Sequence, residues 1–165
     1  MQMDQRGKTA FFTGHRHIPA EAYPKMQKHL EEELRRLIQQ GVRYFGAGGA
    51  LGFDTMAAQA VLKLRLSFPH IRLILVLPCR DQAKKWSAPD IRTYRQILGG
   101  ADKAVYVSEH YYDGCMQKRN RHMADHSAVC LCYLTKASGG TAYTVDYARA
   151  QGLSVINIAK GSICE

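Results

Sequence analysis

The sequence lacks several features that define membrane and secreted proteins. Its longest apolar run, Ile71 to Pro78, is interrupted by Arg72 and is far shorter than the roughly 20 residues that span a bilayer. We therefore predict no membrane segment and no membrane partner. The five cysteines include no C-x-x-C pair, and no basic and apolar leader is visible. These absences favour a reducing compartment, and we expect a cytoplasmic protein.

Two catalytic signatures are also missing. The sequence contains no P-loop and no G-x-S-x-G elbow, which argues against P-loop nucleotide hydrolysis and serine-type acyl transfer. His122 and His126 stand four residues apart, as half of a metal site would, but no third ligand can be identified. Cys130 and Cys132 are expected to pack inside a buried strand. We predict no metal and no cofactor.

The composition is that of one globular domain. The chain has 165 residues, of which 46% are hydrophobic and 22% are charged. A chain of this length buries roughly 70% of the surface that its unfolded form exposes, so a core forms without disulfides. We predict a single domain over residues 1–165.

The net charge of +9 is concentrated in one part of the chain. Between residues 61 and 100, only Asp81 and Asp90 oppose eight basic residues. This excess favours an anionic partner, either a phosphate ligand or a nucleic acid, although a solvated basic face has the same pattern. The basic residues of this segment are Lys63, Arg65, Arg72, Arg80, Lys84, Lys85, Arg92 and Arg95.

Short apolar runs alternate with longer amphipathic patterns along the chain. The predicted strands are Thr9 to Phe12, Val42 to Gly46, Ile71 to Leu77, Ala104 to Val107, Ala128 to Leu134 and Leu153 to Ile158. The predicted helices lie between Pro24 and Gly41, from Phe53 to Leu64, from Asp90 to Leu98, from Met116 to His126 and from Thr141 to Gln151. This alternation predicts an α/β fold, a Rossmann-like three-layer sandwich with a mostly parallel sheet of about six strands.

Four loops that follow predicted strands have compositions suited to a ligand. In such a sheet, ligands bind beyond the carboxyl ends of the strands. Residues 13–16 combine a turn glycine with an arginine, and residues 46–54 are rich in glycine and open directly into a helix. The second loop does not match the dinucleotide fingerprint, and Asp54 is expected to cap the helix that follows.

The other two loops carry cations, an aromatic ring and paired glycines. The loop after Leu77 contains Arg80, Lys84, Lys85 and Trp86, which could stack a base beside phosphate-binding cations or could pack over a helix end. Residues 138–141 place two hydroxyl groups and two glycines at a helix start, which suits a phosphate or a ribose. Because all four loops follow strands, they are predicted to share one crevice.

These motifs, taken in order, resemble the SLOG superfamily and within it the YpsA-like proteins. The resemblance covers most of the chain, from Thr13 to Ile158, and continues through Pro78, Gln82 and Trp86. It is carried by the sequences Thr13-Gly14-His15-Arg16, Gly48-Gly49-Ala50-Leu51-Gly52-Phe53-Asp54, Arg119-Asn120-Arg121-His122-Met123 and Gly139-Gly140-Thr141 with Tyr147-Ala148. The resemblance implies that the protein senses a nucleotide-derived molecule.

Two related families imply different activities. The segment around Arg119 and Asn120 is similar to that of the DprA/SMF proteins, which bind single-stranded DNA. Arg119 and Met123 also fit the lonely-guy phosphoribohydrolases, but their glycine-rich loop is only partly kept in residues 138–146, where Tyr143 replaces a small residue and Asp146 replaces a glutamate. Asp146 keeps the negative charge but is one methylene shorter, and a carboxylate stabilises an oxocarbenium-like transition state only if it is correctly placed.

The leading hypothesis is a sensor-like domain that binds a nucleotide-like or other phosphate-containing small molecule. The alternatives are a nucleoside 5'-monophosphate phosphoribohydrolase, with Arg119 and Asp146 as catalytic residues, and a single-stranded DNA-binding protein. We also expect a homo-oligomer, since Tyr106, Tyr111 and Tyr112 cluster in one connection. The predicted ligand-binding residues are Gly14, His15, Arg16, Gly48, Gly49, Gly52, Asp54, Arg80, Arg119, Asn120, Ser138, Gly139, Gly140 and Thr141.

Overall fold

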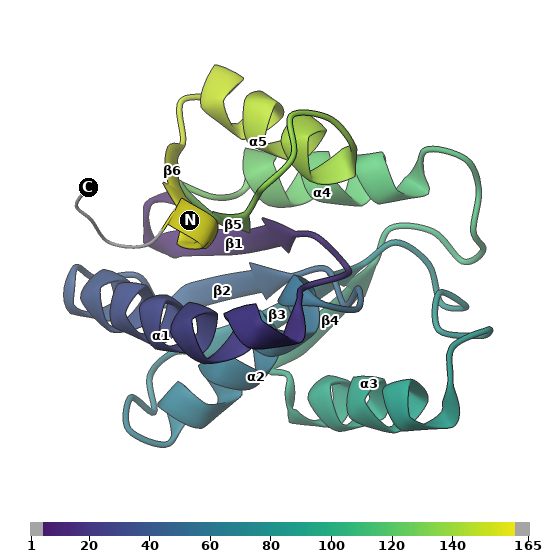
Figure 1. Ribbon diagram of the computed structural model, residues 1–165, viewed down its shortest axis with the longest axis horizontal. Coiled ribbons are helices and arrows are strands. Elements are labelled where there is room, and N and C mark those ends of the chain that lie inside the picture. Colours follow the sequence, from purple (N-terminus) through teal and green to yellow (C-terminus); the bar gives the residue numbers. More distant parts are fainter. Residues whose placement is uncertain (1–4, 161–165) are drawn as a thin grey trace, which may run out of the picture.

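A single parallel sheet organises the protein (Figure 1). The computed structural model describes residues 5–160. The strands are β1 (Thr9–Gly14), β2 (Tyr44–Ala47), β3 (Arg72–Leu77), β4 (Lys103–Tyr106), β5 (Val129–Tyr133) and β6 (Ser154–Asn157). Their order in the sheet is β4-β3-β2-β1-β5-β6, and all neighbouring strands are parallel. This confirms the predicted Rossmann-like α/β fold with six strands.

Five α-helices provide the crossovers that parallel strands require. They are α1 (Tyr23–Gln39), α2 (Phe53–Arg65), α3 (Ala88–Gly100), α4 (Cys115–Asp125) and α5 (Gly140–Ala150). Short 3-10 helices cover Arg6–Lys8, Ala20–Ala22 and Ile158–Lys160. The apolar stripe predicted between Pro24 and Gly41 is buried in α1, where Leu30 and Leu34 are among the least exposed side chains.

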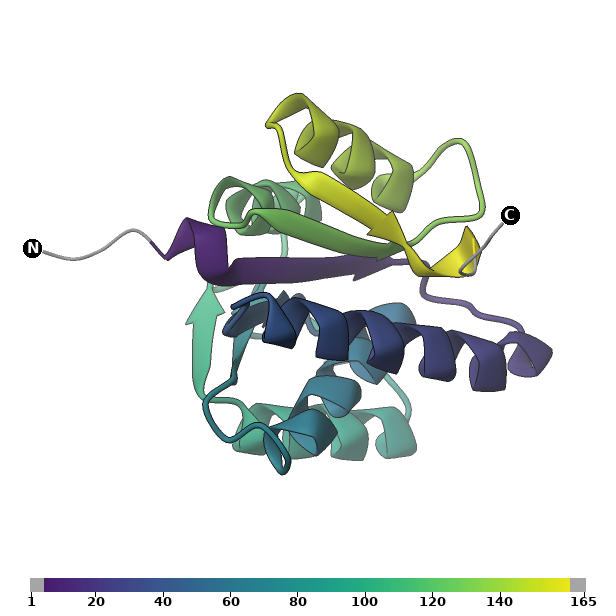
Figure 2. The same cartoon turned by 90° about the vertical axis from the view of Figure 1, so that its left-hand side faces the viewer.

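The helices cover the two faces of the sheet unequally. α1, α2 and α3 lie on one face, and α4 and α5 lie on the other (Figures 1 and 2). Successive strand residues point to opposite faces, so Phe12 packs in the cluster beneath α1 and α2, and Phe11 packs in the cluster beneath α4 and α5. Cys130 and Cys132 are buried in the second cluster, as expected for packing residues.

Within residues 5–160, no helix combines the length and the apolar character that a membrane span needs.

From β1, the sheet extends through β2, β3 and β4 on one side and through β5 and β6 on the other side. The strand order therefore reverses between β1 and β5, which is where open parallel sheets bind their ligands.

Candidate functional site

A cavity of about 320 Å³ lies at the carboxyl ends of β1 and β5. It is formed by the loops that follow β1, β2 and β5, together with the first half of α4. Most of the predicted ligand-binding residues line it, namely Gly14, His15, Arg16, Asp54, Arg119, Asn120, Ser138, Gly139, Gly140 and Thr141. Three of the four predicted loops therefore converge on one crevice.

His15 is held in one orientation by the loop after β5. The backbone N–H of Thr135 donates to His15 Nε2 at 2.9 Å, and the ring lies edge-on to that of Tyr133 at a centroid distance of 6.1 Å. Partial burial and the charge of Lys136 lower the pKa of His15, so the neutral ring is favoured. Because Nε2 accepts a hydrogen bond, the neutral ring carries its proton on Nδ1. His15 thus offers the crevice an uncharged N–H donor.

Arg119 is a buried cation at the floor of the cavity. It is 4% exposed, and it donates from Nε to Asn120 Oδ1 at 2.6 Å and from Nη1 to the carbonyl oxygen of Gly48. Burial lowers the pKa of Arg119, and the nearby carboxylate of Asp54 opposes this effect. A Cβ atom at residue 48 would lie 2.3 Å from Arg119 Nη1, so Gly48 is required for this contact. Arg119 therefore ties the second loop to α4.

Asp54 does not cap α2, contrary to the expectation from its sequence position. The N-cap residue is Gly52, which has a φ of 81° and lies so close to Arg16 that a Cβ atom would be 2.2 Å from the Arg16 carbonyl oxygen. Only glycine fits there, and Asp54 is placed inside the first turn.

The Asp54 carboxylate is buried and only partly satisfied. Asp54 is 5% exposed, and its Oδ2 accepts a hydrogen bond from the N–H of Ala50 at 3.4 Å. Oδ1 is buried and has no hydrogen-bond partner among residues 5–160. Burial raises the pKa of Asp54 to about 6, an effect that Arg119, Arg16 and the backbone N–H groups of Ala50 and Gly48 partly offset. An acceptor without a partner at a cavity floor is suited to a ligand hydroxyl.

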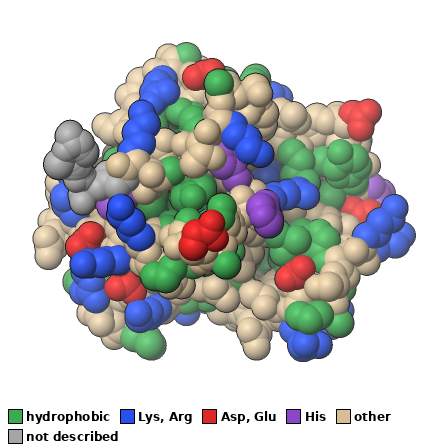
Figure 3. Space-filling view, in the orientation of Figure 1, with side chains coloured by type: hydrophobic (Ala, Val, Ile, Leu, Met, Phe, Trp, Pro, Cys, Tyr) green, Lys and Arg blue, Asp and Glu red, His purple; other side chains and the backbone are tan. Residues whose placement is uncertain are grey.

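The loop after β5 leads into a helix start that no side chain caps. Gly139 is the N-cap residue of α5, with a φ of 104° and no side-chain cap hydrogen bond. The first N–H groups of a helix have no partner within the helix, and together with the helix dipole they attract anions. Arg16 and Lys136 add positive charge to the same cavity. Figure 3 shows Lys and Arg side chains on both sides of this view of the molecule, with His side chains near the middle.

Asn120 connects the buried arginine to the start of α5. Its Oδ1 accepts from Arg119, and its Nδ2 donates to Thr144 Oγ1 at 2.9 Å. Thr144 Oγ1 in turn donates to the carbonyl oxygen of Gly140 at 2.9 Å. The floor of the cavity and its anion-binding end are therefore joined by one chain of hydrogen bonds.

Other predicted residues lie outside this cavity. Gly48, Gly49 and Gly52 shape the second loop without lining the cavity, and Arg80 lies in the third loop. The Arg80 guanidinium forms an ion pair with Glu109 at 2.8 Å and lies 4.1 Å from the centre of the Tyr106 ring. Arg80 is therefore engaged with Glu109 and Tyr106 and is not among the residues that line the cavity.

Asp146 is also not brought to the cavity. It is exposed on α5, five residues after Thr141. At roughly 100° per residue this places it about 140° around the helix from Thr141. Asp146 is therefore not among the residues that line the cavity, and the catalytic role that the lonely-guy resemblance implied for it stays a prediction.

The third loop folds against α3. Trp86 packs edge-on to Tyr94 at a centroid distance of 5.3 Å, so its ring is engaged in packing, whereas Lys84 and Lys85 are largely exposed. In the connection after β4, Tyr111 is 58% exposed and Tyr112 is 42% exposed. The homo-oligomer expected from these tyrosines stays a prediction.

Sequence reasoning missed four residues that line the cavity: Thr13, Ala50, Met116 and Lys136. Lys136 had a usable signal, because a cation that lies between a strand and paired glycines adds charge to a helix start.

Within residues 5–160, no cluster of three or more His, Cys, Asp or Glu side chains is placed to hold a metal ion.

The fold and the cavity define a class of protein: a Rossmann-like domain whose crevice combines exposed cations, a helix start without a cap and a buried carboxylate. The family model described as "YspA SLOG family" matches residues 12–155. The chain belongs to this family, which confirms the resemblance drawn from its motifs.

Relatives and solved structures agree with this assignment. The chain is 32% identical over 138 residues to the uncharacterized SPbeta prophage-derived protein YoqJ of Bacillus subtilis, covering 76% of this chain and 81% of YoqJ. DNA processing protein A (DprA) from Streptococcus pneumoniae has the same fold, with a TM-score of 0.64 and 18% identity over 90% of this chain. The chain spans 49% of that protein.

A second DprA structure concerns nucleic-acid binding. DNA processing protein A from Helicobacter pylori, whose structure is described as showing a unique single-stranded DNA binding mode, has a TM-score of 0.62 and 19% identity. The similarity covers 92% of this chain and 65% of that protein. At this level of identity the two structures show a shared fold.

Proposed function

We propose that the protein binds a nucleotide or a related phosphate-containing small molecule in the cavity between β1 and β5. One observation carries this proposal: the uncapped start of α5 lines the same cavity as Asp54, whose buried Oδ1 has no hydrogen-bond partner among residues 5–160. The first needs an anion and the second needs a hydroxyl donor. A sugar phosphate supplies both groups in one molecule.

The parts of the ligand can be assigned to the residues that match them. The phosphate lies at the N-terminus of α5, next to Gly140 and Thr141, with Arg16 and Lys136 as its cations. A ribose hydroxyl donates to Asp54 Oδ1. Arg119 acts as a positioning residue, because its Nε and Nη1 groups already donate to Asn120 and Gly48. A volume of about 320 Å³ is within the range of small-molecule sites.

Calorimetric titration with AMP, GMP, CMP, UMP and inorganic phosphate tests the proposal. Arg16 is exposed, so Arg16→Ala should leave the fold intact and weaken binding of the preferred nucleotide roughly tenfold, the value of about 1.5 kcal/mol for a lost charge-assisted hydrogen bond. Arg80→Ala is the matched control, because Arg80 is also exposed but pairs with Glu109 outside the cavity. A panel without binding, or equal losses in the two variants, would contradict the proposal.

Binding is supported better than hydrolysis of a nucleoside monophosphate. The hydrolase alternative assigned its carboxylate to Asp146, which is exposed outside the cavity. Release of free base from AMP by the wild-type protein would reverse this preference.

Single-stranded DNA binding is a second candidate that one observation favours. Tyr143 is 45% exposed on α5, two residues after Thr141, and its hydroxyl accepts from Arg121 Nη1 at 3.2 Å. An exposed ring beside a cation can stack a base next to a phosphate bound at the helix start. Anisotropy titration of a labelled oligothymidylate tests this: Tyr143→Ala should weaken binding by about 1 to 3 kcal/mol. Affinity that does not fall with added salt would exclude this mode of binding.

A further inference from the structure

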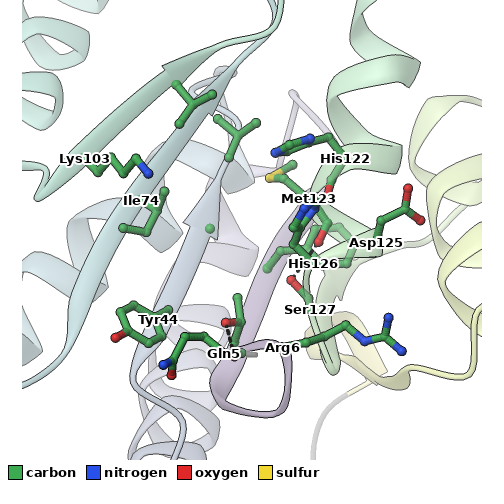
Figure 4. A pocket seen from close by; sticks show the side chains of 15 residues that line it. Gln5, Arg6, Tyr44, Ile74, Lys103, His122, Met123, Asp125, His126 and Ser127 are labelled. Carbon is green, nitrogen blue, oxygen red and sulfur yellow. Dashed lines mark hydrogen bonds between the residues drawn. The ribbon is translucent and has the colours of Figure 1, made fainter. Parts of the chain in front are cut away.

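A second cavity lies at the opposite ends of the strands, on the face that α4 and α5 leave partly open. Its volume is about 480 Å³, and its lining includes Thr9, Tyr44 and Lys103, the first residues of β1, β2 and β4 (Figure 4). Three helices cover the other face of the sheet, whereas this face carries two. Parallel sheets are normally covered on both faces, so an uncovered part is unusual.

The floor of this cavity is apolar. It is formed by side chains that point to one face from neighbouring strands: Phe11 on β1, Ile74 and Val76 on β3, and Val105 on β4. Met123 of α4 closes one side. Such a floor offers no hydrogen bonds to the polar edges of a nucleobase. It suits an acyl chain or an unsubstituted aryl ring.

Three polar groups at the rim are already used within the protein. Thr9 Oγ1 donates to the carbonyl oxygen of Gln5 at 2.7 Å, and Ser127 Oγ donates to that of Met123 at 2.7 Å. The acidic residue of the rim, Asp125, accepts from the Tyr147 hydroxyl at 2.7 Å and points away from the cavity in Figure 4. These three groups are therefore not free to recognise a ligand, and the one carboxylate of the rim does not face a cationic one.

Lys103 supplies a positive charge at the rim. It is exposed at the start of β4 and lies across the cavity from His122 in Figure 4, and its side chain forms no ion pair or hydrogen bond within the described range 5–160. A cation without a partner beside an apolar floor is complementary to an anion that carries an apolar body. We name this site the β1–β4 groove, defined by Phe11, Ile74, Val76, Lys103, Val105 and Met123.

We propose that the β1–β4 groove binds an amphipathic carboxylate, with its acyl or aryl body on Ile74, Val76 and Val105 and its carboxylate paired with Lys103. The site is separate from the proposed nucleotide cavity, which lies at the carboxyl ends of β1 and β5. The proposal therefore stands whether or not the protein binds a nucleotide.

Octanoate and octan-1-ol are the probes, because they share an apolar chain and differ in the charge that Lys103 recognises. Each is titrated into the ¹⁵N-labelled full chain, and amide chemical shifts report where it binds. Octanoate should shift the amides of β3, β4 and the last turn of α4. Lys103→Ala should weaken octanoate binding up to about fivefold, as expected for an exposed ion pair, and leave octan-1-ol unchanged. Lys63→Ala is the matched control, since Lys63 lies on α2 and pairs with Glu31.

A second variant tests the apolar floor. Val105 is partly exposed on the edge strand β4, so Val105→Asp should keep the fold, as circular dichroism checks, and abolish binding of both probes. Equal octanoate affinity in wild type and Lys103→Ala would overturn the proposal. So would amide shifts confined to the nucleotide cavity, or a wild-type dimer that Val105→Asp converts to a monomer, because a second copy would then occupy the groove.

Discussion

Replacing Asp54 by asparagine should change how the stability of the protein depends on pH. Burial raises the pKa of Asp54 to about 6 from an ordinary value of 3.8. The folded protein therefore binds this proton more tightly than the unfolded chain does. The resulting stabilisation is complete below pH 3.8 and is lost as the pH rises through about 6. A difference of about two pKa units corresponds to about 3 kcal/mol.

Urea unfolding at a series of pH values between 4 and 8 measures this effect, in buffers without phosphate because phosphate is expected to bind in the cavity that Asp54 lines. Asparagine has the same shape but does not titrate, so the wild type should lose most of the 3 kcal/mol relative to Asp54→Asn across this range. Arg119 stays protonated throughout, and its attraction to the ionised Asp54 is already contained in the pKa of about 6, so Arg119 adds no second titration to the curves. Parallel curves for the two proteins would refute the reasoning.

Two other substitutions examine the buried charges at the cavity floor. Gly48→Ala should destabilise the fold by about 1 to 3 kcal/mol in urea unfolding, because the added Cβ would meet the Arg119 guanidinium. Gly99→Ala is the control. Gly99 lies in open space on α3, so this substitution should stabilise the fold by about 0.5 to 1 kcal/mol. Similar effects of both changes would contradict the packing account. Arg119→Ala should raise the pKa of Asp54 further, because it removes the strongest charge that offsets burial, and ¹³C NMR titration of the Asp54 carboxyl checks this.

The fold was predictable because each strand is a short apolar run between turn signals. The boundaries were harder, as the second strand shows. It was expected to begin at Val42, but the N–H of Val42 donates to the carbonyl oxygen of Leu37 at 3.0 Å and completes the end of α1, so β2 begins at Tyr44. An apolar residue beside a helix end can pack there or enter a strand, and periodicity does not distinguish the two.

The candidate site was predictable where composition alone positions a loop. A glycine with a cation located the loop after β1, and paired glycines with hydroxyl groups located the loop after β5, since such loops must lie at the carboxyl edge of the sheet. The partnership of Gly48 with Arg119 was not predictable, because it joins residues far apart in the chain through the packing of α4 on the sheet. Asp146 was assigned by motif, and the rotation of α5 places its side chain elsewhere.

Amide chemical-shift mapping with AMP tests the central claim most directly. The ¹⁵N-labelled protein is titrated with AMP, and the affected amides identify where the phosphate and the ribose lie. The account predicts that the amides of Gly139, Gly140 and Thr141 shift together with those of His15 and Ala50, because the phosphate lies at the start of α5 and the ribose lies at Asp54. Shifts confined to β3, β4 or the exposed face of α3, with these five amides unmoved, would contradict it.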